Sequence, residues 1–102
     1  MSDITNGKGG IVSVTATPQL IALATTATNG VNQKTGMTCK VWNVGANTVY
    51  AVVNVNATGE YTESAAVPIP AGESFPFVGQ PMRSLCVACK TGITSTIHYG
   101  AY

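Results

Sequence analysis

Cys86 and Cys89 are the residues whose types and spacing come nearest to a chemical site in this sequence. They lie in the stretch LCVACKTG, residues 85–92, and two thiols separated by two residues can bind zinc or exchange disulfides. Cys39 and His98 would complete a set of four zinc ligands. They do not form a second closely spaced pair, however, which is the feature that makes a zinc-finger pattern specific. A metal site at these four residues is therefore only an alternative.

The residues around the two cysteines favour an extended strand. Side chains alternate between the faces of a strand, so Cys86 and Cys89 would point in opposite directions, with Cα atoms roughly 10 Å apart. Two sulfurs bound to one zinc ion lie at most about 4–5 Å apart. We therefore predict buried structural thiols without a metal or cofactor, and a hairpin turn at Lys90-Thr91-Gly92.

His98 is the single histidine of the chain. Catalysis by a histidine needs a nucleophile and an orienting carboxylate nearby. The acidic residues are Asp3 near the N-terminus, Glu60 and Glu63 in a polar loop, and Glu73. The sequence contains no phosphate-binding loop, dinucleotide-binding fingerprint or nucleophile elbow. We predict that the protein is not an enzyme.

The composition excludes several classes of partner. The chain has 102 residues, the size of one domain, and only 9% of them are charged, with a net charge of +1. Proteins that bind nucleic acids or anionic membranes concentrate lysine and arginine, so we expect neither partner. The N-terminus lacks the apolar region of a signal peptide, and an odd number of cysteines, three, does not form a disulfide framework. We expect synthesis in a reducing cytoplasm.

The organisation predicted from the sequence is a flexible N-terminal arm, residues 1–10, followed by one β-domain, residues 11–102. From Ile11 onward, short β-branched runs are broken by turn residues at intervals of roughly 8–12 positions, which is typical of a sandwich or barrel. The fold class is therefore all-β, an antiparallel β-sandwich or barrel of jelly-roll or immunoglobulin-like type. Strands are expected at 10–17, 19–26, 37–44, 47–56, 65–69, 73–78, 83–90 and 93–99.

Turn residues predict how some of these strands are joined. Gly45-Ala46-Asn47 accepts positive φ angles and predicts a tight hairpin between residues 40–44 and 48–56. The two prolines in Val67–Pro70 place that segment at a sheet edge. In the following strand Phe75 and Phe77 share a face, and we expect both to enter the core.

Aromatic side chains offer a second kind of site. Stacking on sugar rings could use Trp42, Tyr50, Tyr61, Tyr99 and Tyr102. Aromatic residues in strands are more often core or interface residues, because they bury a large area and keep a polar tip. A glycan- or receptor-binding β-sandwich is therefore an alternative function.

Two stretches carry a resemblance to a known class of proteins. VWNVGANTVYAVV, residues 41–53, resembles the Val-x-Asn-x-Gly-Ala-Asn-x-Val/Leu hairpin of small tailed-phage virion proteins. VPIPAGESFPF, residues 67–77, is similar to their Ile-Pro-Ala-Gly-x-Ser-x-x-Phe turn and strand. The resemblance implies a virion structural protein of the capsid decoration (cement) type. Such a protein is made in the host cytoplasm and binds the major capsid protein at the capsid surface as a homo-oligomer, often a trimer.

The composition agrees with this expectation. A neutral surface repels its own copies weakly and loses little hydration energy on assembly, which suits permanent packing better than the steering of a soluble ligand. We expect residues 1–10 and the edge at Val67–Pro70 to anchor the protein. A tail or head–tail joining protein is an alternative within the same virion class.

Overall fold

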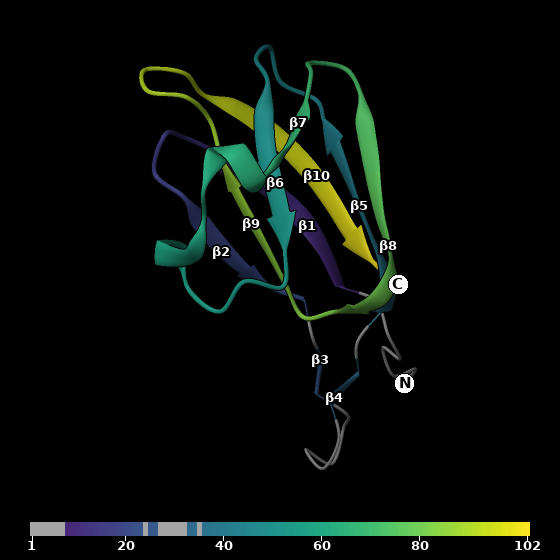
Figure 1. Cartoon of the computed structure of the whole chain (residues 1–102). Coiled ribbons are helices and arrows are strands. Elements are labelled where there is room, and N and C mark those ends of the chain that lie inside the picture. Colours follow the sequence, from purple (N-terminus) through teal and green to yellow (C-terminus); the bar gives the residue numbers. More distant parts are fainter. Residues whose placement is uncertain (1–7, 24, 27–32, 35) are drawn as a thin grey trace.

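The chain folds into two antiparallel four-stranded sheets packed face to face, as seen in a computed structural model (Figure 1). The structure describes residues 8–23, 25–26, 33–34 and 36–102. Sheet A consists, in spatial order, of β1 (Lys8–Val14), β10 (Ser95–Ala101), β5 (Gly36–Asn43) and β8 (Ser74–Met82). Sheet B consists of β2 (Gln19–Ala22), β9 (Ser84–Ala88), β6 (Val49–Val53) and β7 (Val67–Ile69).

Consecutive strands almost always lie in different sheets. The chain changes sheet between β1 and β2, between β5 and β6, and at each step from β7 to β10. In the two main sheets, only β6 and β7 are both consecutive and adjacent. This order is that of a jelly roll, and it confirms the predicted all-β antiparallel sandwich. Within the described residues, no helix is long and apolar enough to span a membrane.

The N-terminal part of the domain begins earlier than the sequence predicted. Residues 8–10 belong to β1 and pair with residues 99–101 of β10, so the prediction of an arm over residues 1–10 was wrong for its last three residues. Two glycines there do not prevent pairing, because β10 supplies a regular partner along the whole of β1. Residues 1–7 lie outside the described residues.

The connection from β2 to β5 contains a small additional ladder. β3 (Thr25–Thr26) pairs with β4 (Gln33–Lys34) beyond one end of the sandwich (Figure 1). The strand predicted at 19–26 is therefore divided into β2 and β3, while residues 27–32 lie outside the described part of the chain.

The core lies between the sheets and is made of alternating side chains from both. In the central strand β9, Leu85 and Val87 belong to this core, whereas Cys86 and Ala88 are on the outer face of sheet B. All five residues of β9 are nevertheless buried. The segment between β6 and β7, with the 3-10 helices η1 (Thr58–Glu60) and η2 (Glu63–Ala65), lies against that outer face (Figure 1). A segment expected to be a polar loop thus buries the second face of β9.

The hairpin predicted at Gly45–Asn47 was wrong. This turn carries the chain from β5 in sheet A to β6 in sheet B, and none of its residues has a positive φ. The glycine is needed for close approach instead: a Cβ at Gly45 would lie 2.5 Å from the backbone nitrogen of Thr96 and would overlap the Ser95 hydroxyl. Packing against β10, rather than hairpin geometry, therefore determines this turn.

The turn predicted after Cys89 exists but does not form a hairpin. Ile93 N–H donates to the carbonyl oxygen of Lys90 at 3.0 Å, and Gly92 has a φ of 79°, a left-handed conformation that glycine adopts without strain. The turn joins β9 of sheet B to β10 of sheet A.

The proline-containing segment lies at a sheet edge, as predicted. Pro68 is within β7, the edge strand of sheet B, and the following strand β8 is the edge of sheet A. Phe75 and Phe77 share a face of β8, with ring centroids 4.9 Å apart. Phe77 packs against the core, but Phe75 is 36% exposed. The prediction that both enter the core was wrong for Phe75, which lies on an edge strand.

Candidate interaction surface

The four residues of the alternative metal site lie in different parts of the sandwich. Cys39 of β5 is in the core, whereas His98 of β10 is on the outer face of the same sheet. Cys86 is on the outer face of sheet B, and Cys89 follows the end of β9 and packs in the core. The described residues contain no group of three or more potential metal ligands. The fold therefore does not bring these four side chains together.

The three thiols are free and buried. Burial raises the pKa of Cys39 to about 11, and burial also raises the pKa values of Cys86 and Cys89. The Cys89 sulfur lies 3.8 Å from the carbonyl oxygen of Val14, within hydrogen-bonding reach. Protonated, enclosed thiols are poor nucleophiles and poor metal ligands. In this structure the LCVACKTG stretch forms most of β9 and the turn that follows it.

The outer face of sheet A presents a continuous row of exposed side chains. The strand register places Ile11, His98 and Trp42 side by side across β1, β10 and β5. Ile11 is 66% exposed and Trp42 is 38% exposed. Val44 and Val78 are exposed as well, and Lys40 is half-buried beside them. We refer to the outward side chains of Ile11, Lys40, Trp42, Val44, Val78 and His98 as the Trp42 face.

The indole of Trp42 has neighbours on both sides of it within this face. Its ring lies against Gly100 of the neighbouring strand, with the ring edge 4.0 Å from where a Cβ would be. The Lys40 ammonium lies 5.1 Å from the ring centroid, in the range of a cation–π interaction. A shallow, mainly apolar hollow of about 470 Å³ is lined by Gly10, Ile11, Trp42, Val44, His98 and Tyr99.

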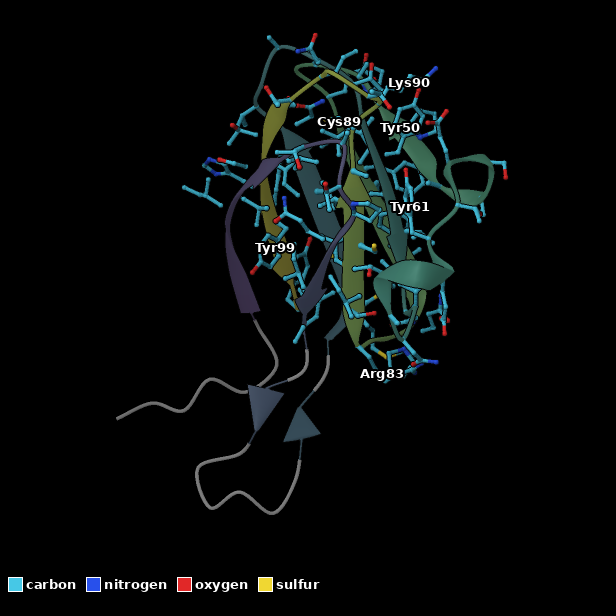
Figure 2. All side chains as sticks on the ribbon, turned by 90° about the vertical axis from the view of Figure 1, so that its left-hand side faces the viewer. Tyr50, Tyr61, Arg83, Cys89, Lys90 and Tyr99 are labelled. Carbon is cyan, nitrogen blue, oxygen red and sulfur yellow. The ribbon has the colours of Figure 1, made fainter. Side chains whose placement is uncertain are left out.

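Of the other aromatic residues singled out in the sequence, only Tyr99 lines the hollow beside Trp42 in the described part of the chain. Tyr50 and Tyr61 are on the sheet B side of the molecule, near Cys89 and Lys90 (Figure 2). Tyr99 packs toward the core, with its ring close to Gly10. Tyr50 and Tyr61 therefore do not share a stacking platform with Trp42.

Side chains near Tyr50 and Tyr61 contact the segment between β6 and β7 that lies against the outer face of sheet B. The Lys90 ammonium lies 5.9 Å from the Tyr50 ring centroid and 3.8 Å from a Glu63 carboxylate oxygen. Burial, with a smaller contribution from Glu63, raises the pKa of Tyr61. The Lys90 and Glu63 side chains are more than half exposed, so their ion pair contributes little.

Sequence patterns identified only part of the Trp42 face. The residue types of Trp42 and His98 mark them as candidates in the sequence, whereas Ile11, Val44 and Val78 carry no chemical group that marks them. Their alternation with core residues was a signal, but only the strand register shows that side chains from separate strands share one row.

Comparisons with known proteins agree on the fold. No protein-family model and no curated protein matches the sequence. A solved structure described as PirA matches with a TM-score of 0.55 and 9% identity, covering 92% of this chain and 93% of PirA. A protein of Bacillus endospore appendages, described as a novel family of disulfide-linked pili, matches with a TM-score of 0.52 and 14% identity over 99% and 94% of the two chains. The chain shares its sandwich fold with both.

Proposed function

We propose that this protein is a structural subunit of a larger protein assembly, and specifically a capsid decoration protein that binds the major capsid protein of a virion. The observation that carries the proposal is the Trp42 face. It brings together exposed side chains from all four strands of sheet A, among them the apolar Ile11, Trp42 and Val78. The Trp42 indole lies against Gly100 and beneath the Lys40 ammonium. Tryptophan anchors of this kind are enriched among the residues that dominate binding energies.

The proposed mechanism is mechanical. Covering the Trp42 face with a partner removes apolar area from water, at about 25 cal/mol per Å², and the rigid sheet loses little conformational entropy on docking. A subunit that contacts two neighbouring capsid proteins adds buried area at their joint. Expansion of the shell or pressure from packaged DNA must then break these additional contacts.

The low charge of the chain supports permanent assembly. Only 9% of the residues are charged, so few ionic groups lose hydration when surfaces come together. The described part of the Trp42 face includes one cation, Lys40, which is already placed over the Trp42 ring. Docking of the Trp42 face therefore requires neither long-range electrostatic steering nor a charged ligand.

The fold comparison supports an assembly role only as an analogy, because one fold serves many functions. The Bacillus appendage protein is described as forming disulfide-linked pili. In the present chain all three cysteines are buried, with 0%, 0% and 5% exposure for Cys39, Cys86 and Cys89. We therefore propose association without covalent links through these thiols.

The motif that resembles phage virion proteins has a role inside the fold. Asn43, Gly45 and Asn47 make contacts at the crossover from β5 to β6. In this chain the motif is therefore a folding element. The argument for docking therefore depends on the Trp42 face, while the motif suggests the class of particle.

Copy number in purified particles tests this proposal. Quantitative mass spectrometry of virions that carry this gene should find the protein on the order of hundreds of copies, as expected when each capsid joint is occupied in a symmetric shell. About a dozen copies or fewer would instead identify a tail or head–tail joining protein. Absence from the particles would contradict both virion assignments.

A glycan-binding role is a second candidate, favoured by the hollow beside Trp42. In this hollow the Trp42 indole could stack on a sugar ring, and the neighbouring His98 imidazole could hydrogen-bond to a sugar hydroxyl. Titration with glycans, followed through the emission of the single tryptophan, tests this function. Saturable quenching, together with glycan capture that Leu20→Ala retains and Trp42→Ala loses, would support it, and a glycan array without hits would remove it.

A further inference from the structure

The four edge strands of the sandwich differ in how well they are protected against pairing. β7 has three residues and contains Pro68, and β8 contains Pro76 and Pro81. β2 has four residues and follows Pro18. By contrast, β1 has seven residues without a proline and pairs with β10 in unbroken register. Short length, prolines and charged side chains are devices that block edge pairing; of these, β1 has only Lys8, at its first residue.

The outward backbone groups of β1 can be assigned from the neighbouring ladder. The carbonyl oxygen of Thr96 accepts from Val44 N–H at 3.0 Å, so the Thr96 backbone is directed toward β5. Backbone direction alternates along an antiparallel ladder. Ser13, opposite Thr96, is therefore directed away from β10, and so are Ile11 and Gly9.

A side-chain contact agrees with this assignment. The Ser13 carbonyl oxygen accepts a hydrogen bond of 2.7 Å from the Gln19 side-chain amide, at the free side of β1. The N–H and C=O groups of Gly9 and Ile11 are left at the edge. Among the described strands, none lies beyond β1 in sheet A. This edge therefore offers two evenly spaced pairs of backbone donors and acceptors.

We propose that β1 pairs antiparallel with β1 of a second copy of this chain, with Gly9 of each copy opposite Ile11 of the other. The arrangement is self-complementary, because each free N–H meets a free C=O. From Gly9 to Val14 the strand has no charge to repel its copy. The exposed Ile11 side chain lies over Gly9 of the partner, which has no side chain to obstruct it.

This pairing rests on the proposed function and specifies how copies meet within it. In a continuous antiparallel sheet, paired residues project to the same side, so the two Trp42 faces become one double-sized surface. Two linked docking faces bind more tightly than one. The contact has two-fold symmetry, in contrast to the trimer implied by the resemblance to virion proteins.

The edge contact is small, so the free pair should be weak. A stable interface buries about 1,200–2,000 Å² in total, which a ladder between two short strands does not reach. The measurement must therefore extend to millimolar protein, and it should report on the proposed bonds themselves.

Hydrogen exchange of single backbone amides, followed by NMR, provides this report. The Ile11 amide is directed to the free edge and should exchange about tenfold more slowly at 1 mM than at 10 µM protein, roughly as pairing becomes populated. The Val12 amide is directed to β10 and should remain protected at both concentrations. Equal, fast exchange of the Ile11 amide across this range would overturn the proposal.

A matched pair of proline variants tests the same edge independently. Ile11→Pro removes a backbone N–H that does not bond to β10. Val78→Pro makes the same change on the other edge strand of sheet A, β8. The two side chains are almost equally exposed, 66% for Ile11 and 64% for Val78. In sedimentation at millimolar concentration, Ile11→Pro should be monomeric, while Val78→Pro should associate as the unmodified chain does. Association of both variants, or of neither, would contradict the assignment to β1.

A third variant covers the case in which Ile11→Pro does not fold. Ile11→Lys retains the backbone N–H and places like charges near each other across the paired strands, so it should also abolish association. Circular dichroism confirms that each variant is folded. Binding of the unmodified chain to particles is a separate measurement, because Ile11 itself belongs to the Trp42 face. A chain that docks without pairing would overturn the pairing and leave the proposed function intact, whereas a chain that pairs without docking would contradict that function alone.

Discussion

The side-chain amide of Asn43 donates a hydrogen bond to the backbone carbonyl of Ile69, at 2.8 Å, and so joins the end of β5 in sheet A to the end of β7 in sheet B. The same amide donates to the Asn47 carbonyl at 2.7 Å. Its side-chain oxygen accepts from the Ser95 hydroxyl at 2.8 Å and from Gly45 N–H at 3.1 Å. One buried side chain thus connects several crossovers at this end of the sandwich.

Asn43→Ala should destabilise the fold by about 2–4 kcal/mol, because it leaves several buried polar groups without a partner. Asn47→Ala removes one exposed hydrogen bond, to the Thr94 carbonyl, and should cost about 0.5–1.5 kcal/mol. Urea unfolding of both variants measures the difference. Equal losses for the two would show that the Asn43 network does not hold the sheets together.

Gly45→Ala should be strongly destabilising, by roughly 1–3 kcal/mol or more, because the added methyl group overlaps β10. Gly59→Ala provides the matched control, since a Cβ at Gly59 meets no atom within 4 Å. Thermal unfolding compares the two. If Gly45→Ala unfolded at the same temperature as Gly59→Ala, the close approach to Ser95 and Thr96 would be refuted.

Stability should decline in alkaline solution through the thiol of Cys39. Its pKa is near 9 in the unfolded chain and about 11 in the folded one, so the folded state binds the proton more tightly. The contribution is complete below pH 9 and is lost as the pH rises toward 11, at most about 2–3 kcal/mol.

Cys39→Ala is the variant that isolates this effect. It has lower stability overall, because it leaves a cavity, but its free energy of unfolding should fall less between pH 9 and 11 than that of the unmodified chain. Parallel declines over this range would assign the alkaline instability to other groups, such as Tyr61.

The strands were predictable because burial imposes local periodicity. Residues 83–90 read as a strand from their apolar run alone, and β9 occupies residues 84–88. The buried thiols of Cys86 and Cys89 followed from the same alternation. In these segments the local preference and the final fold agree, as is usual for sequences that fold to one structure.

The pairing of strands was not predictable from turn residues. Gly45–Asn47 and Lys90–Gly92 have the composition of hairpin turns, yet both carry the chain between sheets. The partner of each strand is decided by contacts distant in sequence, such as that between Asn43 and Ile69, 26 residues apart. Turn composition contains no information about these contacts.

The candidate surface was only partly predictable for the same reason. Trp42 was recognisable as a candidate binding aromatic, but Ile11, which lies in the same row across the sheet, comes from a strand much earlier in the chain. Their proximity depends on β10 lying between β1 and β5. Only the register of β1, β10 and β5 shows that Ile11, His98 and Trp42 lie side by side.

Docking of purified protein onto particles that lack it tests the central role of the Trp42 face most directly. Trp42→Ala should weaken binding on the order of thirtyfold, the effect of truncating a central interface residue. Leu20→Ala is the control, because Leu20 is exposed to a similar degree, 41% against 38%, but lies on the outer face of sheet B. We predict unchanged binding for Leu20→Ala. Full binding by Trp42→Ala, or loss only with Leu20→Ala, would contradict the account.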